Sequence, residues 1–365
     1  MNLDLNKLQR IYKTIKESKL TGRWIKFNDI APMLKKHQNS FKIQEIGNSE
    51  MGLPITKISL GKGSKRILIW SQMHGNESTG TKAVFDLLNY LNKNSKEAKF
   101  ILENCKIEII PILNPDGADK FTRENSKNID LNRDAVTIEA KESKILRTSL
   151  NTFNPHYCFN LHDQRSIFNV SGTCNPATIS FLAPSEDKDR RLTTGRKKTM
   201  SVIVSMNHLL QQIIPNQVGR YTDEFYPTAT GDNFQKLGHN TILIEAGYFK
   251  NDMDREVVRA LNFYALVQGI YFISNNNKSV DYKKYFDIPN NSKEFLEIIY
   301  KNVSVVQNNV SQILDVGIQY KFKIKNNQLT EYQCIEKIGD LSNYCTYNYI
   351  NAENKHINEL KLSNS

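Results

Sequence analysis

The chain has 365 residues, of which 39% are apolar and 10% aromatic, and this composition excludes an intrinsically disordered chain. The formal net charge of +11 comes from 49 basic and 38 acidic residues that are scattered along the sequence without a dense basic block. We therefore expect a solvated surface and no nucleic-acid partner. The length suits one large α/β domain with an appendage, and it also suits two domains.

The N-terminal segment predicts an amphipathic helix over residues 5–19 and contains no apolar stretch like that of a signal peptide. The longest apolar runs that we recognise, RILIW and KIEIIPIL, have the length of strands and are too short to cross a bilayer. We therefore expect a cytoplasmic protein without a membrane partner. Its oligomeric state is not predictable from these features.

The cysteines are odd in number and include no CxxC pair, and they are Cys105, Cys158, Cys174, Cys334 and Cys345. Without a secretory signal, this pattern favours reduced thiols that pack as small apolar side chains.

Strand-like and helix-like segments alternate from residue 41 onward. Short apolar runs predict strands at 41–46, 54–60, 65–70, 105–113, 156–163, 178–184 and 240–248. Helical spacing of apolar residues predicts helices at 81–91, 137–150, 197–214 and 254–273. The sequence NPDG, residues 114–117, predicts a turn. This alternation predicts an α/β fold in which a sheet carries helices on both faces.

The character of the sequence changes near residue 285. Residues 318–338 and 342–354 alternate as exposed strands do, and Asn326 and Asn327 form a plausible hairpin turn. We divide the chain into an N-terminal helical lead-in over residues 1–40, a catalytic domain over 41–284 and a small β-rich C-terminal extension over 285–365. The extension carries no motif to which we can attach chemistry.

Chemically active side chains follow several of the predicted strands. His74 and Glu77 come after the strand at 65–70, Arg123 follows the strand at 105–113, and His162 and Glu245 lie at the ends of two further strands. Ligands of open α/β sheets gather at the carboxyl ends of the strands. We therefore expect these side chains to share one site.

Two histidines and one glutamate are the ligand set of an open zinc site, which leaves a fourth position for water. His74, Glu77 and His162 would supply this set, and Glu245 is the candidate general base because it ends a buried strand, where burial raises the pKa of a carboxyl. Simpler interpretations stay open for each residue alone. His74 and Glu77 can be three residues apart by chance, His162 can be a hydrogen-bonded edge residue, and Glu245 can be a helix cap or an ion-pair partner.

The order of motifs adds further information. Residues 45–275 contain HGNE, NPDG, FTRENSKNIDLNRD, FNLHDQ and TILIEAGY in this order. In this respect the chain resembles the zinc carboxypeptidase family, whose members are the carboxypeptidase A-like metallopeptidases. Within the family it resembles a bacterial subgroup. The resemblance implies a mixed, mostly parallel sheet between helical layers and one bound Zn²⁺ ion.

The resemblance also implies a role for individual residues. His74, Glu77 and His162 look like the zinc ligands, and Glu245 looks like the catalytic glutamate. Arg123 resembles the arginine that stabilises the oxyanion. Asn132 and Arg133 resemble the pair that binds the terminal carboxylate of the substrate. Tyr226 resembles the mobile tyrosine that covers this carboxylate, with Tyr221 as the alternative. Asp130 resembles the aspartate that orients a histidine ligand, here His74.

These observations predict a zinc-dependent metallocarboxypeptidase-like hydrolase that cleaves an amide bond next to a free carboxylate. Its substrate would be a peptide or an acyl amino acid with that carboxylate. Two alternatives stay open, which are a zinc amidase or deacylase of N-acyl amino acids or cell-wall peptides, and an inactive peptide-binding protein. The pocket for the terminal side chain is not legible in the sequence, so we predict no preference for that residue.

Overall fold

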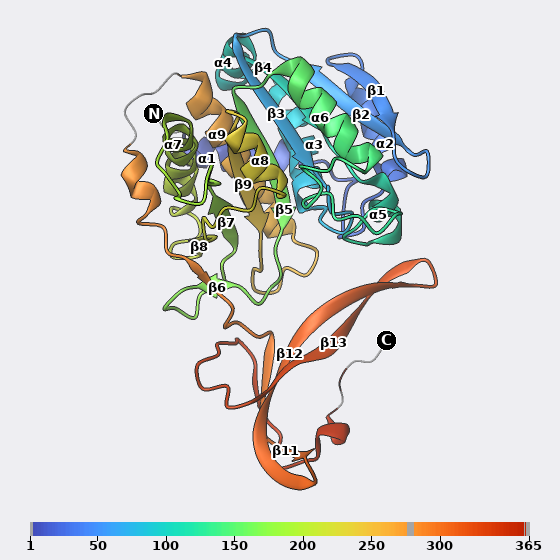
Figure 1. Cartoon of the computed structure of the whole chain (residues 1–365), viewed down its shortest axis with the longest axis vertical. Coiled ribbons are helices and arrows are strands. Elements are labelled where there is room, and N and C mark those ends of the chain that lie inside the picture. Colours follow the sequence, from blue (N-terminus) through green and yellow to red (C-terminus); the bar gives the residue numbers. More distant parts are fainter. Residues whose placement is uncertain (1–2, 276–280, 361, 363–365) are drawn as a thin grey trace.

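The computed structural model describes residues 3–275, 281–360 and 362 and shows an α/β body with a β-rich extension beneath it (Figure 1). An eight-stranded sheet crosses the body. Its strands are β1 (Lys42–Asn48), β2 (Pro54–Leu60), β3 (Lys65–Ser71), β4 (Cys105–Ile110), β5 (Tyr157–Asp163), β7 (Ile179–Leu182), β8 (Val218–Arg220) and β9 (Asn240–Ala246). The predicted α/β fold is confirmed.

The strand order is β1-β2-β4-β3-β5-β9-β7-β8, and the pairing is mixed. The pairs β4–β3, β3–β5, β5–β9 and β7–β8 are parallel, whereas β1–β2, β2–β4 and β7–β9 are antiparallel. Because β3, β5 and β9 are adjacent and parallel, their carboxyl ends meet at one edge of the sheet. The residues that follow these three strands are therefore brought together.

Helices cover both faces of the sheet. They are α1 (Leu5–Ile15), α2 (Phe27–His37), α3 (Thr79–Leu91), α4 (Lys96–Asn104), α5 (Pro115–Lys120), α6 (Lys141–Phe153), α7 (Thr194–Leu210), α8 (Thr230–Lys236) and α9 (Glu256–Ser274). Alternate residues of β3 point to opposite faces of the sheet. Ile67 and Ile69 pack with α3, α7 and α9, and Leu68 and Trp70 pack with α6 and α8. Both faces of the strand are buried, which explains its unbroken apolar run.

The NPDG segment differs from the prediction, because it begins a short helix rather than a simple turn. Asn114 caps α5, and its side-chain oxygen accepts a hydrogen bond from the Gly117 backbone N–H at 2.8 Å. Pro115 occupies the first turn of this helix, where its missing N–H has no cost.

Helix α9 is long and apolar enough to cross a membrane by length and composition, a property that the sequence analysis overlooked. However, 83% of its apolar window is buried inside the protein. It packs against α3 and α7. This burial is typical of the core helix of a folded domain.

The C-terminal region forms a four-stranded sheet with the order β13-β12-β11-β14. Its strands are β11 (Ile298–Gln307), β12 (Val310–Lys325), β13 (Gln328–Gly339) and β14 (Tyr349–Asn351), and a further pair joins β6 (Asn169–Val170) to β10 (Asn291–Ser292). Asn326 and Asn327 have φ angles of 51° and 58° and form the predicted turn between β12 and β13. The two short 3-10 helices are Tyr282–Tyr285 and Ile357–Glu359.

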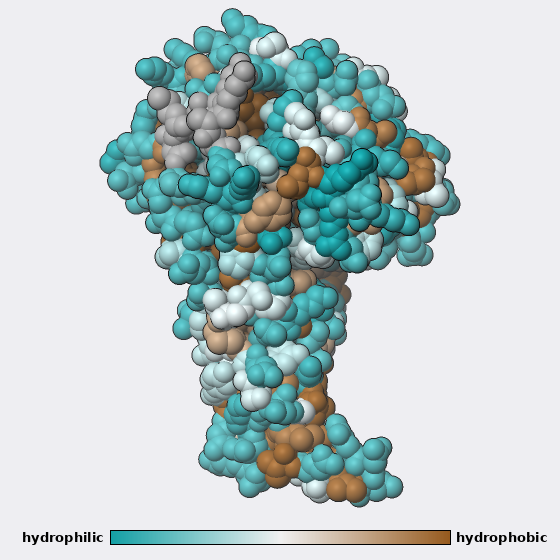
Figure 2. All heavy atoms as spheres, turned by 60° about the vertical axis from the view of Figure 1, so that its left-hand side comes forward, coloured by the Kyte–Doolittle hydropathy of each residue, from teal (hydrophilic) through white to brown (hydrophobic). Residues whose placement is uncertain are grey.

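A separate small core stabilises the extension and contains Val303, Val305, Val316 and Ile318. Figure 2 shows the extension as a narrower region below the body, with apolar surface near its far end. The predicted β-rich extension is thus present. The boundaries at residues 40 and 284 stay predictions, although α1 and α2 contribute side chains such as Leu8 to the main core.

The prediction of reduced thiols is wrong for two cysteines, because Cys174 and Cys345 form a disulfide. It joins the β6 region to the extension across 171 residues of sequence. Nothing in the local sequence of either cysteine indicates such a distant partner. Cys105 and Cys158 are free and buried, as packing residues would be.

An ion pair buried in the main core ties the N-terminal segment to the body. Arg259 of α9 and Asp86 of α3 have side chains with 0% exposure, and two of their hydrogen bonds measure 2.7 Å. Arg259 also donates to the backbone oxygens of Leu20 and Glu17, at 2.6 and 2.9 Å. The residues that connect α1 to α2 are therefore held by the same guanidinium that neutralises Asp86.

We expect Arg259→Met to lower the free energy of unfolding by about 3–5 kcal/mol, because it leaves the Asp86 charge buried without its cationic partner. Urea unfolding followed by circular dichroism measures this change. The control is Arg191→Met, which breaks the ion pair of a 72%-exposed arginine with Asp187 and should change the unfolding midpoint little. Equal effects of the two substitutions would contradict the conclusion that the buried Arg259–Asp86 ion pair stabilises the fold.

Candidate functional site

The turn between β3 and α3 presents His74 and Glu77 at the carboxyl edge of the sheet. The Glu77 backbone N–H donates to the His74 carbonyl at 3.1 Å, which closes the turn. Gly75 lies so close to the backbone of Gly117 and Ala118 that a Cβ atom would collide with both. The tight packing of this glycine allows the two functional side chains on either side of it to point the same way.

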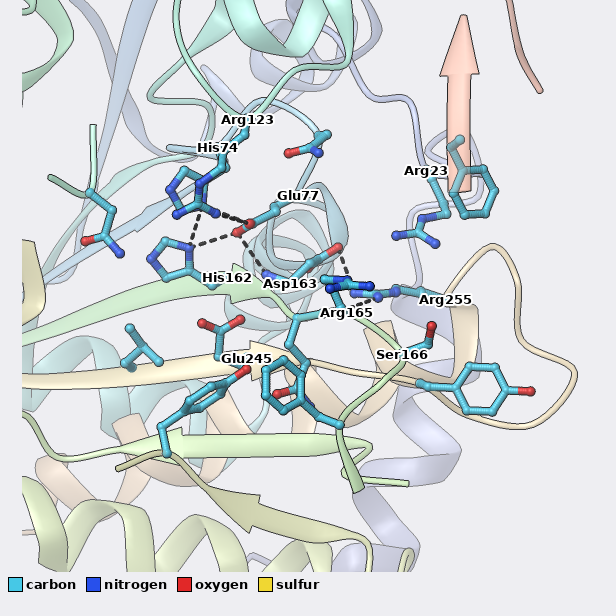
Figure 3. A pocket seen from close by; sticks show the side chains of 18 of the residues that line it. Arg23, His74, Glu77, Arg123, His162, Asp163, Arg165, Ser166, Glu245 and Arg255 are labelled. Carbon is cyan, nitrogen blue, oxygen red and sulfur yellow. Dashed lines mark hydrogen bonds and ion pairs between the residues drawn. The ribbon is translucent and has the colours of Figure 1, made fainter. Parts of the chain in front are cut away.

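His162 at the end of β5 completes a buried cluster with His74 and Glu77 (Figure 3). His74 Nδ1 lies 2.8 Å from Glu77 Oε1, and His162 Nδ1 lies 2.8 Å from Glu77 Oε2. The two Nδ1 atoms lie 3.2 Å from each other. Their possible ligand atoms are all within 4.8 Å of one another. The exposed fractions of these three residues are 2%, 8% and 2%.

This donor set fits a bound cation. The imidazole nitrogens face each other and the carboxylate, so their lone pairs converge on one point. Two imidazoles and one carboxylate are ligands that suit zinc and leave further positions open.

Asp130 and Arg123 support this cluster from one side. The Asp130 Oδ1 atom lies 3.1 Å from His74 Nε2, and its Oδ2 atom accepts hydrogen bonds from Arg123 Nε and Nη2 at 3.1 and 3.0 Å. Burial alone would raise the pKa of Asp130, but the hydrogen bond with His74 and the Arg123 charge hold this pKa well below its usual value. Such a carboxylate fixes the orientation of the imidazole on which it acts.

Arg123 also reaches the cluster itself. Its Nη1 atom lies 3.2 Å from His74 Nδ1 and 3.4 Å from Glu77 Oε1. The Asp163 backbone N–H donates to Glu77 Oε2 at 3.0 Å and further restrains the carboxylate. The charge of Arg123 is thus fixed beside the point where the ligand atoms converge.

Glu245 lies beside His162, because the two residues are register partners on the parallel strands β9 and β5. Figure 3 shows its carboxylate directed toward the cluster. Burial, followed by the negative charges of Glu77 and Asp163, raises the pKa of Glu245 well above its usual value. A carboxylate with a raised pKa can hold a proton near neutral pH, as a general acid or base must.

A cavity of about 680 Å³ opens above this cluster, which is a typical size for a small-ligand site. All the predicted site residues except Asp130 line it, and Asp130 acts from behind His74. The Asn132 Oδ1 atom accepts a hydrogen bond from the Thr230 backbone N–H at 3.0 Å. Arg133 donates to the Asn132 carbonyl at 2.7 Å through Nη1.

The two candidate tyrosines differ in freedom. Tyr226 is 50% exposed, and its hydroxyl donates to the Glu224 carboxylate at 3.0 Å. Tyr221 packs edge-on against Phe168, with ring centroids 5.2 Å apart, and burial raises its pKa. Tyr226 is therefore the tyrosine with room to move, although its role stays a prediction.

The sequence analysis missed a second group of cavity residues. Arg23, Arg165 and Arg255 line the cavity, as do Phe322 and Tyr332 of the extension. No local pattern marks these positions. The only available signal was the mixture of aromatic and basic residues in the exposed strands of the extension, which is also typical of a solvated sheet.

Comparisons with known proteins agree with this geometry. Residues 28–166 match the family model described as zinc carboxypeptidase. The chain is 32% identical over 131 residues to Carboxypeptidase 2 of Trichophyton equinum, a match that covers 35% of this chain and 24% of that protein. It is 32% identical over 172 residues to the carboxypeptidase SOL1 of Arabidopsis thaliana, with coverage of 41% and 35%. The chain thus spans about a quarter to a third of the length of these curated relatives.

A solved structure shows the same fold over a larger part of the chain. A metallo-carboxypeptidase from Burkholderia cenocepacia aligns with 69% of this chain and 70% of its own, with a TM-score of 0.57 and 16% sequence identity. The matched family segment includes His74, Glu77 and His162 but ends before Glu245. The resemblance to the zinc carboxypeptidase family that was drawn from the motif order is confirmed, whereas the bacterial subgroup stays a prediction.

Proposed function

We propose that this chain is a zinc-dependent metallocarboxypeptidase that removes the C-terminal residue of peptides, because residues 28–166 match the zinc carboxypeptidase family model. The single observation that carries the proposal is the convergence of His74, Glu77 and His162 with Glu245 directed at the same point. His74, Glu77 and His162 would hold one Zn²⁺ ion. When bound in such a site, zinc lowers the pKa of a water molecule and polarises a carbonyl group.

The residues of the chain supply the other parts of the reaction. Glu245 accepts a proton from the attacking water and donates it to the departing amine, for which its raised pKa is suited. Arg123 places a fixed positive charge where negative charge develops on the attacked carbonyl oxygen. Asp130 keeps both His74 and Arg123 in position, since its two oxygens contact one each.

The substrate would be held by its terminal carboxylate. Arg133 presents a guanidinium fork that matches a carboxylate, and among the described residues this guanidinium donates a hydrogen bond only to the Asn132 carbonyl, through Nη1. Asn132 lies next to it, and Tyr226 lies on the same side of the cavity. A free carboxylate bound there limits cleavage to the last peptide bond.

We expect Arg133→Ala to raise KM about 10- to 100-fold for peptides with a free C-terminus, because a charge-assisted hydrogen-bond pair is lost. Steady-state kinetics on matched peptides with free and amidated C-termini measure this effect. The amidated peptide is the control, and its slow cleavage should change little. An equal loss on both peptides would remove the carboxylate-binding role of Arg133.

The substrate class is tested by a direct comparison. Zinc-loaded protein is incubated with unmodified peptides and with N-acyl amino acids, and the released amino acids are measured by mass spectrometry. Our proposal predicts loss of one residue from the C-terminus of the peptides. Faster hydrolysis of the acyl amino acids would favour a deacylase, and binding without any cleavage would favour an inactive binding protein.

We also propose a cytoplasmic location without nucleic-acid or membrane partners, on the basis of composition. The Cys174–Cys345 disulfide argues against this location, because such bonds are rare in reducing compartments, and thiol alkylation provides the test. Alkylation in denaturant directly upon cell lysis, which also exposes the buried Cys105 and Cys158, should modify all five cysteines if the cytoplasm is its location. Modification of three would place the mature protein in an oxidising compartment.

A further inference from the structure

The C-terminal extension forms one wall of the cavity, although its sequence carries no catalytic motif. Strand β12 contributes Tyr320, Lys321 and Phe322 to the lining, and β13 contributes Tyr332. Glu297 and Gln319 of the extension complete this wall. The wall belongs to the site itself and not only to the surface beside it.

Three links fix this wall to the residues that follow His162. Arg165 forms an ion pair with Glu336 at 2.7 Å. The Ser166 hydroxyl donates to Gln319 at 2.6 Å. The Cys174–Cys345 disulfide lies further along the same connection. The segment that extends from β5 is thus bound to the extension at several points.

Arg23 on the connection between α1 and α2 faces this wall. Its backbone is fixed next to the metal cluster, because Ser78 donates to the Arg23 carbonyl at 2.6 Å and Lys82 donates to the Gly22 carbonyl at 2.8 Å. Its guanidinium carbon lies 4.4 Å from the centre of the Phe322 ring, which is a cation–π contact. Figure 3 shows the guanidinium directed into the cavity.

The guanidinium of Arg23 has no hydrogen bond or ion pair among residues 3–275, 281–360 and 362. The neighbouring Arg255 is already paired with Asp163 at 3.2 Å. The other charges that act on Arg23 belong to Asp254, Glu297 and Glu331, and none forms an ion pair with it. Burial and then the Arg255 charge lower the pKa of Arg23 to about 9, so it remains charged at neutral pH.

The position of Arg23 relative to the cluster of His74, Glu77 and His162 indicates which part of a bound peptide its charge would contact. The charge of Arg133 acts on Tyr226 and Asp232, whereas that of Arg23 acts on Asp163, Arg255 and Glu297. Figure 3 shows Arg23, Arg165 and Ser166 together on one side of the cluster. Arg23 and Arg133 line the same cavity with different neighbours, so a peptide whose terminal carboxylate is bound at Arg133 would extend past the cluster toward the wall that contains Arg23.

We propose that Arg23, stacked on Phe322, is a specificity residue that binds an acidic side chain on the residue before the scissile bond. The proposal rests on the carboxypeptidase function proposed above and names a substrate class for it, peptides with glutamate or aspartate in the penultimate position. Phe322 positions the guanidinium, and the extension thereby takes part in substrate selection. An acidic side chain would supply the ion-pair partner that Arg23 lacks among the described residues.

The test uses two peptides that differ only in a penultimate glutamate or glutamine and share the same terminal residue. We expect the full-length, zinc-loaded protein to have a kcat/KM about tenfold higher for the glutamate peptide, because a hydrogen bond between charged groups is gained. In Arg23→Gln this ratio should fall to about one through loss of activity on the glutamate peptide alone. Arg23→Lys should keep part of the preference, and Phe322→Ala should reduce it.

The control is Arg191→Gln, an exposed arginine outside the cavity, which should leave the ratio unchanged. A ratio near one in the unmodified protein, or a ratio that survives Arg23→Gln, overturns the inference. An equal loss on both peptides also overturns it, because it would mean that Arg23 binds the peptide backbone. No cleavage of either peptide by the unmodified protein contradicts the proposed function, and the inference then falls with it.

Discussion

Glu245→Gln is expected to lower kcat by about 10²- to 10⁴-fold while leaving zinc affinity unchanged. Glutamine has the shape of glutamate but cannot accept a proton from water at neutral pH. Glu245 does not belong to the group of side chains that can hold the metal, which is His74, Glu77 and His162. The change should therefore remove proton transfer and spare the metal site.

Two measurements separate these effects. Release of the terminal amino acid gives kcat, and a competitive titration against a chelating dye gives the zinc affinity. Glu103→Gln, which alters an exposed carboxylate at the end of α4, is the matched control and should behave like the unmodified protein. Loss of zinc from the Glu245→Gln protein would mean that Glu245 is a ligand and that its role is misassigned.

Loss of a residue that only supports a metal ligand weakens metal binding roughly 10- to 100-fold. His162→Ala is expected to weaken zinc binding by more than this, because it removes one of the three proposed ligands. Activity should disappear with it. The structure also predicts a physical readout that needs no substrate. Zinc should raise the melting temperature of the unmodified protein, since it binds only the folded site, and should raise that of the variant far less.

The control for this variant is His208→Ala, which removes an exposed histidine from α7. It should keep the full thermal shift and the full activity. If His162→Ala retained both, the metal would bind elsewhere, and the cluster of His74, Glu77 and His162 would need another explanation.

The central sheet was predictable because its strands are short apolar runs with polar ends. Ile67 to Trp70 is apolar throughout since both faces of β3 are covered by helices. The placement of His74, His162 and Glu245 followed from the rule that parallel strands end at one edge. Local patterns were therefore sufficient to predict that these side chains lie together.

Features that depend on distant contacts were not predictable. The disulfide joins cysteines 171 residues apart, and Arg259 binds the backbone of Glu17 and Leu20 more than 200 residues away. The contact of Arg23 with Phe322 is of the same kind. Each depends on how the extension or the N-terminal segment packs on the body, and single-sequence patterns contain no record of that packing.

The most direct test of the account is a zinc titration of the metal-free protein, with release of the C-terminal residue of a peptide as the readout. We predict that activity rises with added zinc and reaches its limit at one ion per chain, and that a chelator abolishes it. Failure to release a terminal residue at any zinc content, or activity that a chelator leaves intact, would contradict the assignment of this site as a zinc carboxypeptidase centre.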